Sequence, residues 1–270
     1  MEARREPRSG PVSLLADILA SKRSDVARLR AEPRRPGGHT PLDVRGTLRR
    51  PPGARLRLIA EVKLRSPSAG SLSTALSPQD RACAYAEAGA AMVSVLCDGP
   101  YFGGSFEHLS ATRRRLHEAG LSVPVLAKEY VVDPRQVAEA RDRGADAVLL
   151  IARIVDAHSL STLVRCARDE GIEPLVEVMD ERELEWAMAT GAGVVGVNAR
   201  DLDTLKMDQA RAARVLATLP PTVVAIHMSG VRDTEGVRAL SEGRADAVLL
   251  GEALMRQDDP RPMLRELVSA

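Results

Sequence analysis

The feature of this chain that most constrains its fold is a regular alternation of short apolar runs with amphipathic segments of helical period. Short apolar runs are typical of strands that are buried on both faces. The helical segments between them fit the crossover connections that parallel strands require. The runs are residues 56–62, 92–96, 125–127, 147–151, 174–178, 194–197, 222–226 and 247–250.

Eight strand–helix units of fairly even length predict an α/β protein, a single (β/α)8 TIM barrel. Several runs follow a step such as Ala88-Gly89-Ala90, which fits a helix C-cap leading into the next strand. An open, doubly wound sheet is the alternative. It is disfavoured because no G-x-G-x-x-G motif follows the first run.

The N-terminal part of the chain precedes this alternation. Residues 11–34 carry apolar positions at helical spacing, with Ser13 as a plausible N-cap, and predict a helix. A polar stretch rich in Pro, Arg and Gly follows, with a possible short helix at 41–48. We therefore expect residues 1–54 to form a helical extension that packs on a barrel domain of residues 55–270.

Composition excludes several classes of function. The 38 Lys+Arg and 37 Asp+Glu nearly cancel, so no field of one sign predicts binding to nucleic acid or to a membrane surface. The arginine run at 113–115 is interpreted as a solvated helix face. Three widely spaced cysteines without a C-x-x-C motif support neither a disulfide framework nor a metal site. We expect a cytoplasmic protein, a monomer or a homodimer.

Charged and polar residues gather at the ends of the apolar runs, where the active sites of (β/α)8 barrels are built. Because side chains alternate along a strand, Glu61 and Lys63 share one face, and Asn198 and Arg200 share another. Lysines and glutamates that converge on one barrel mouth can pair and acquire the shifted pKa values that proton transfer needs. A purely structural ion-pair network is the alternative. The residues are Glu61, Lys63, Lys128, Glu177, Asn198 and Arg200.

Three short segments predict a phosphate site. The loop at 63–68 offers the hydroxyl of Ser66, and glycines at 230 and 251 follow the seventh and eighth runs, with Ser229 beside the first of them. Loops after strands seven and eight hold phosphate in many barrels, and glycine lets the backbone approach an anion closely. His227 and its neighbour Met228 cannot both face the site, and we interpret His227 as a core histidine.

These residues, in this order, resemble the indole-3-glycerol phosphate synthase family over about residues 14–267. The segment at 59–68 (IAEVKLRSPS) is similar to the first-strand signature of that family. The segments at 101–105 (YFGGS), 176–178 (VEV), 197–202 (VNARDL) and 251–255 (GEALM) also match its motifs.

The resemblance implies a carboxy-lyase of tryptophan or indole biosynthesis that uses no cofactor or metal. Its reaction closes the ring of 1-(2-carboxyphenylamino)-1-deoxyribulose 5-phosphate, a sugar phosphate, and releases carbon dioxide and water. Carried over, Lys128 is the general acid, Glu177 the base or second acid, and Lys63 the partner of the substrate carboxylate. Glu61 and Asn198 position these groups, and the expected substrate- or phosphate-binding residues are Ser66, Arg200, Ser229, Gly230, Gly251, Phe102 and Tyr130.

The sequence departs from the family pattern at three places. The seventh strand of the family ends Ala-Glu-Ser-Gly, whereas this chain has Met228 in place of the glutamate. The third strand carries Lys-Asp-Phe in the family and Lys128-Glu129-Tyr130 here, preceded by Ala127 where the family has a basic residue. The site therefore has one carboxylate fewer than the family pattern. We expect the pKa of its lysines to be lower than it would be with the glutamate present, because an opposite charge nearby favours the protonated form.

Two other functions remain open from the sequence. One is a paralogue that acts on a modified anthranilate or a different sugar, which Met228 and Tyr130 motivate. The other is a non-catalytic barrel that binds a sugar phosphate. A barrel isomerase such as phosphoribosylanthranilate isomerase is disfavoured, because its reaction needs a Cys and Asp pair where this chain has Lys and Glu.

Overall fold

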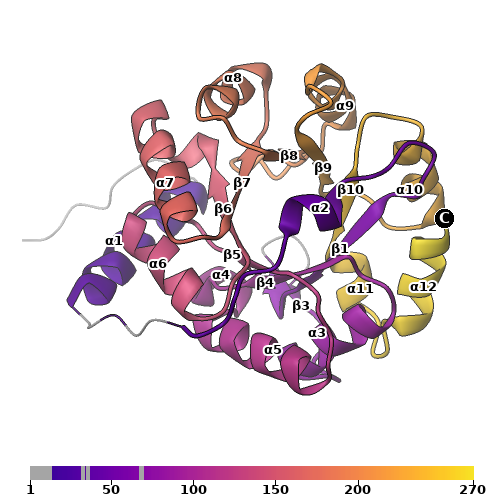
Figure 1. Cartoon of the computed structure of the whole chain (residues 1–270), viewed down its shortest axis with the longest axis horizontal. Helices are drawn as coiled ribbons and strands as arrows, with labels where there is room; N and C mark the ends of the chain where they lie inside the picture. Colours follow the sequence, from indigo (N-terminus) through magenta and orange to yellow (C-terminus); the bar gives the residue numbers. More distant parts are fainter. Residues whose placement is uncertain (1–13, 32–33, 35–36, 67–69) are drawn as a thin grey trace, which may run out of the picture.

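The computed structural model describes residues 14–31, 34, 37–66 and 70–270. Its centre is a closed barrel of parallel strands in the order β1-β10-β9-β8-β7-β6-β5-β4. The ring closes where β1 pairs with β10, with Ile59 opposite Leu249. The predicted (β/α)8 barrel is confirmed (Figure 1). The strands are β1 (Arg57–Val62), β4 (Met92–Leu96), β5 (Val125–Lys128), β6 (Ala147–Ile151), β7 (Glu173–Val178), β8 (Val194–Asn198), β9 (Val224–Met228) and β10 (Ala247–Leu250).

One strand lies two residues from its predicted position. The run at 222–226 predicted the seventh strand, which the structure places at Val224–Met228. The difference arises because the backbone N–H of Val223 donates to the carbonyl of Pro220 at 3.1 Å, so Thr222 and Val223 belong to a turn. As a result Met228 is the last residue of β9 and not part of the following loop.

The outer helices begin at residues that cap them. Each of α3 and α5 to α10 follows a Ser or Asp whose side chain accepts a backbone N–H of the first turn. These caps fix where each βα loop ends at the C-terminal mouth of the barrel. The helices are α3 (Pro78–Glu87), α5 (Phe106–Glu118), α6 (Pro134–Asp142), α7 (Ala157–Asp169), α8 (Glu181–Ala189), α9 (Gln209–Thr218), α10 (Thr234–Ser241) and α12 (Arg261–Ser269).

Short elements occupy the βα loops. Helices α4 (Gly99–Phe102) and α11 (Glu252–Met255) follow β4 and β10, and the 3-10 helix η1 (Ala152–Ile154) follows β6. Two short antiparallel strands, β2 (Arg65–Ser66) and β3 (Gly70–Ser71), follow β1. These segments shape the mouth of the barrel, because they lie beyond the carboxyl ends of the strands.

Two layers of apolar side chains support the barrel. An outer layer lies between strands and helices, and an inner layer fills the barrel with side chains such as Ile59, Leu126 and Leu175. Helix α2 (Val44–Leu48), capped by Asp43, adds Val44 and Leu48 to the inner layer and lies across the ring in Figure 1. The predicted short helix at 41–48 is therefore present and covers one end of the barrel interior.

The first helix, α1 (Leu14–Ala31), lies outside the ring. The predicted helix at 11–34 is confirmed over these residues, while its proposed cap, Ser13, lies outside the described residues. α1 packs beside α6, where the Arg135 guanidinium donates to the carbonyl of Leu29 at 3.0 Å. The N-terminal segment is thus attached to the barrel wall.

The interpretation of the arginine run as a solvated face is wrong for Arg113. Its Nε donates to the carbonyl of Gly144 at 2.9 Å, and its guanidinium pairs with the buried Asp146. Asp146 also accepts the backbone N–H of Val125, so Arg113 completes a buried polar cluster beside β5 and β6. Arg114 is exposed, as predicted.

The described residues contain neither a membrane-spanning helix nor a cluster of metal-ligating side chains. There, no helix is both long and apolar enough to cross a bilayer. Nor does this part of the chain bring together three or more His, Cys, Asp or Glu side chains suited to a metal ion.

Candidate active site

A cavity of about 830 Å³ opens at the C-terminal mouth of the barrel. Its wall includes nearly all the site residues that the sequence predicted, although they come from six of the eight strand ends and their loops. Those that line it are Glu61, Lys63, Ser66, Phe102, Lys128, Tyr130, Asn198, Arg200, Met228, Ser229, Gly230 and Gly251. Residues 67–69, part of the predicted phosphate loop, lie outside the described residues.

At the centre of the site, one carboxylate joins two lysines. Glu61, at the end of β1, lies 2.6 Å from Lys63 Nζ through Oε1 and 3.4 Å from Lys128 Nζ through Oε2. Gly251 makes room for this cluster: a Cβ there would lie 2.5 Å from Glu61 Oε1 and 2.8 Å from Lys63 Nζ. A larger residue after β10 would therefore displace this ion pair, apart from any role of the glycine towards phosphate.

The cluster fixes the charge of its members. Burial opposes ionisation of Glu61, but Lys63 and Lys128 together outweigh it and hold the pKa of Glu61 at about 2. Burial likewise acts against a charge on Lys128, yet Glu61 and Glu177 raise its pKa above the ordinary value. Both lysine-facing carboxylates thus favour a protonated Lys128 at neutral pH, which is the state that a general acid requires.

The second carboxylate of the site, Glu177, is bound by an amide and not by a lysine at hydrogen-bond distance. Glu177, at the end of β7, accepts a hydrogen bond from Asn198 Nδ2 at 2.8 Å, and Asn198 Oδ1 accepts the backbone N–H of Arg200 at 2.9 Å. Burial raises the pKa of Glu177, while Lys128 and Asn198 oppose that rise. Its Oε2 is buried and has no hydrogen-bond partner in the part of the chain that the structure describes. This carboxyl is therefore suited to taking up and returning a proton.

Glu177 is the one predicted catalytic residue that does not line the main cavity. It lines a small cavity of about 10 Å³ that shares Asn198, Arg200 and Leu202 with the main one. Its link to the site runs through the Asn198 amide and the charge of Lys128. The sequence placed it correctly at a strand end but did not show that Asn198 lies beside it.

Two of the predicted phosphate-site residues lie in an unusual backbone conformation. Ser229 and Gly230, directly after β9, have φ values of 73° and 93°. A Cβ at Gly230 would lie 2.1 Å from Gln209 Nε2, so no larger residue fits there without movement. The positive φ at Ser229, a non-glycine residue, marks local strain at the cavity wall.

Met228 brings an apolar side chain to this polar site. It is 1% exposed, lines the cavity, and pairs in register with Asn198 on β8 and Leu249 on β10. Its sulfur packs so closely on Gly196 that a Cβ at that glycine would lie 2.3 Å away. His227 does not line the cavity, and its Nε2 lies 3.1 Å from the carbonyl of Ser229. The interpretation of His227 as a core residue is confirmed.

An apolar wall completes the cavity. The rings of Phe102 and Tyr130 lie 6.1 Å apart between centroids, tilted by 32°. Leu14 and Ile18 of α1 also line the cavity, which the sequence analysis did not predict. The available signal was their spacing of four residues, which places them on one face of the helix together with Lys22.

The fold and the mouth cluster define a (β/α)8-barrel protein whose lysines and carboxylates gather where barrel enzymes carry their active sites. The family model of indole-3-glycerol phosphate synthase matches residues 15–267. The chain belongs to this family.

Relatives of known name agree with this assignment. The chain is 42% identical to the indole-3-glycerol phosphate synthase of Mycobacterium ulcerans (strain Agy99) over 267 residues, which cover 96% of this chain and 95% of the relative. It is 41% identical to the protein of the same name from Mycobacterium leprae (strain Br4923), with the same coverage.

Solved structures share the fold at low identity. A 3-hexulose-6-phosphate synthase matches with a TM-score of 0.63 at 18% identity and covers 79% of this chain and 99% of that one. A chain of the tryptophan synthase α2β2 complex from Pyrococcus furiosus matches with a TM-score of 0.58 at 16% identity, covering 79% and 98%. At this identity the likeness concerns the barrel alone.

Proposed function

We propose that this chain is an indole-3-glycerol phosphate synthase. It converts 1-(2-carboxyphenylamino)-1-deoxyribulose 5-phosphate into indole-3-glycerol phosphate, carbon dioxide and water, in tryptophan or indole biosynthesis. The observation that carries the proposal is the cluster in which Glu61 joins Lys63 and Lys128 within 3.4 Å, beside the Glu177–Asn198 pair. In this proposal residues 1–54 form the helical extension of a cytoplasmic enzyme and residues 55–270 form its barrel domain.

Lys128 acts as the general acid. Ring closure places negative charge on the oxygen of the substrate carbonyl, and a nearby ammonium group stabilises that charge and donates a proton. The raised pKa of Lys128 supports this role because it keeps the side chain protonated until the substrate arrives. Lys63, held 2.6 Å from Glu61, is placed to bind the substrate carboxylate that leaves as carbon dioxide.

Glu177 handles the protons of dehydration. It takes a proton from the ring-closed, decarboxylated intermediate and returns it to the leaving hydroxyl group, which departs as water, and Asn198 holds its carboxyl by the 2.8 Å hydrogen bond. The raised pKa of Glu177 supports this role, since a base is most effective when its pKa approaches the working pH. Ser66, Gly230 and Gly251 bind the phosphate, with Ser229 and Arg200 at the same wall.

Product identification tests the proposal. Purified protein is incubated with the carboxyphenylamino-deoxyribulose phosphate, and indole-3-glycerol phosphate is measured by fluorescence and released carbon dioxide by trapping. We expect equal amounts of both products. Conversion of phosphoribosylanthranilate instead, or binding of the substrate without either product, would show that the barrel has another function.

A further inference from the structure

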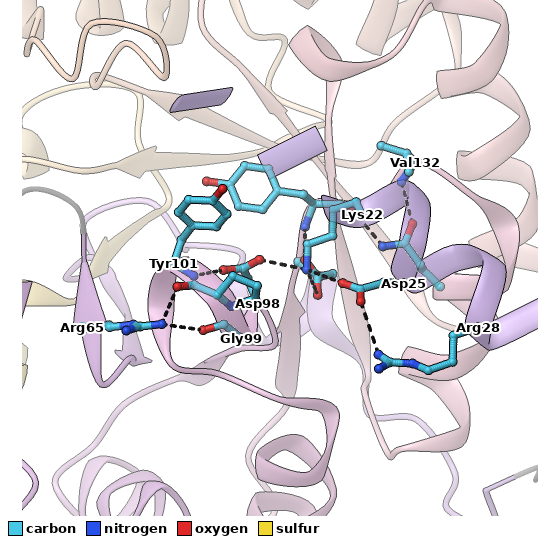
Figure 2. A network of polar contacts seen from close by, with 12 residues as sticks. Lys22, Asp25, Arg28, Arg65, Asp98, Gly99, Tyr101 and Val132 are labelled. Carbon is cyan, nitrogen blue, oxygen red and sulfur yellow. Dashed lines mark hydrogen bonds and ion pairs between the residues drawn. The ribbon is translucent and has the colours of Figure 1, made fainter. Parts of the chain in front are cut away.

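A buried lysine of the N-terminal helix connects α1 to two loops of the barrel mouth. Lys22 is 2% exposed, and its Nζ lies 2.8 Å from Asp98 Oδ1, 3.0 Å from Glu129 Oε1 and 3.3 Å from Asp25 Oδ2. Asp98 follows β4 and Glu129 follows β5, and their side chains are 0% and 4% exposed. Figure 2 shows Lys22 reaching from the helix into this network. Lys22, Asp98 and Glu129 are here termed the α1 clamp.

Each carboxylate of the α1 clamp also holds a segment that carries an aromatic residue of the cavity. Asp98 Oδ2 accepts the backbone N–H of Tyr101 at 2.9 Å and so caps α4, the helix that ends in Phe102. Glu129 Oε1 accepts the backbone N–H of Tyr130 at 2.7 Å. The two segments that carry the aromatic rings of the cavity wall are therefore hydrogen-bonded, through their backbone, to the same two side chains that bind Lys22.

The lysine itself shares a helix face with the rest of the apolar wall. Leu14, Ile18 and Lys22 are spaced four residues apart, so they lie along one face of α1, and the first two line the cavity. One buried cation thus joins the aliphatic part of the wall, on α1, to its aromatic part, on the loops after β4 and β5. Arg65 also holds the loop after β4, because its guanidinium donates to the carbonyl of Gly99 at 3.1 Å (Figure 2).

We propose that Lys22 is a positioning residue that assembles the apolar wall for the aromatic ring of the substrate. The inference rests on the proposed function, which supplies an aromatic sugar phosphate as the ligand. The polar residues of the cavity suit the carboxylate and the phosphate of the substrate. Among its apolar residues, Leu14, Ile18, Phe102 and Tyr130 are carried by α1 and by the loops after β4 and β5, the segments that the α1 clamp joins, and this surface takes the ring. Removal of Lys22 would leave two buried carboxylates without their cation, a costly arrangement that drives α1 and the loops apart.

The experiment compares two ligands that differ in the aromatic ring. Dissociation constants for indole-3-glycerol phosphate and for inorganic phosphate are measured on wild type and Lys22→Met. We expect the aromatic ligand to bind about tenfold more weakly, the loss expected when apolar groups no longer cover the ring, while phosphate affinity stays unchanged. Equal weakening of both ligands, which general loosening of the barrel would cause, overturns the proposal, and so does unchanged binding of both.

Two further variants serve as a control and as a milder change of the same contact. Arg28→Met is the matched control on the same helix, because Arg28 is 70% exposed and pairs only weakly with Asp25 at 3.3 Å; it should bind both ligands as wild type does. Glu129→Gln retains an acceptor for the Tyr130 N–H and leaves Lys22 paired with Asp98, so it folds even where Lys22→Met does not. For Glu129→Gln we expect a smaller loss of affinity that is again confined to the aromatic ligand. An equal loss of affinity for both ligands, or no loss for either, contradicts the proposal. Turnover of the substrate by wild type is measured separately and tests the proposed function. The binding measurements test the role of Lys22, because they do not depend on turnover.

Discussion

Glu61→Gln removes the charge that joins Lys63 to Lys128 and is expected to affect stability and catalysis together. The pKa of Glu61 is about 2, against 4.5 for an unperturbed carboxyl. At about 1.4 kcal/mol per pKa unit, this difference corresponds to about 3 kcal/mol of unfolding free energy at pH 7. Because the folded-state pKa is the lower one, this stabilisation is complete well above pH 4.5 and is lost as the pH falls towards 2.

Urea denaturation of wild type and Glu61→Gln measures this contribution. The variant should be less stable by about 3 kcal/mol at pH 7, and the gap should shrink by about 1 kcal/mol at pH 4, where the unfolded chain already binds the proton. Glu87→Gln is the control, because Glu87 pairs with Arg261 at the surface and is 42% exposed. The unfolding free energy of this control variant should fall by less than about 1 kcal/mol.

The same variant tests the electrostatics of catalysis. Glu61 is the largest contributor that raises the pKa of Lys128, so the alkaline limb of the kcat/KM profile should move to lower pH in Glu61→Gln. An alkaline limb that stays in place, together with a stability gap that does not change with pH, would refute the assignment of Glu61 as the carboxylate that keeps Lys128 protonated.

Three other changes have expected outcomes that follow from the same contacts. Met228→Glu adds a carboxylate to the cavity wall and should move the alkaline limb to higher pH; an unmoved limb in the pH–rate profile would mean that residue 228 does not act on the lysines. Asn198→Ala removes the hydrogen bond that lowers the pKa of Glu177, so the acidic limb of kcat should move to higher pH, and a downward shift would contradict the role of Glu177 as base. Gly251→Ala places a methyl group 2.5 Å from Glu61 Oε1 and should lower kcat/KM and cost about 1–3 kcal/mol in thermal melts. Gly38→Ala, whose methyl group would meet no atom of the described residues within 4 Å, should do neither.

Local patterns in the sequence were sufficient to predict the barrel. Buried parallel strands have apolar side chains on both faces and so form apolar runs in the sequence. For seven of the eight runs, both ends agree with the ends of the observed strand to within one residue. The exception, β9, is displaced because Thr222 and Val223 have strand-like side chains but follow two prolines and form a turn. Periodicity alone does not distinguish such a turn from the start of a strand.

The candidate site was predictable where it depends on strand ends. Alternation placed Glu61 beside Lys63, and the structure puts their charged atoms 2.6 Å apart. The position of Glu177 in the small cavity, and not in the main one, depends on how β7 and β8 pack against each other, which no single strand encodes. The contribution of α1 was missed because the docking of a helix on a barrel is a long-range property. Its one local sign was Lys22, a charged residue on the same face as apolar Leu14 and Ile18.

The most direct test of the acid–base site is a single-turnover measurement on wild type and Lys128→Met with the carboxyphenylamino-deoxyribulose phosphate. The methionine keeps much of the side-chain volume but cannot donate a proton. We expect wild type to form indole-3-glycerol phosphate and the variant to form it at least about 100-fold more slowly, with little change in substrate dissociation constant. Ring closure by Lys128→Met at the wild-type rate would contradict the site described here.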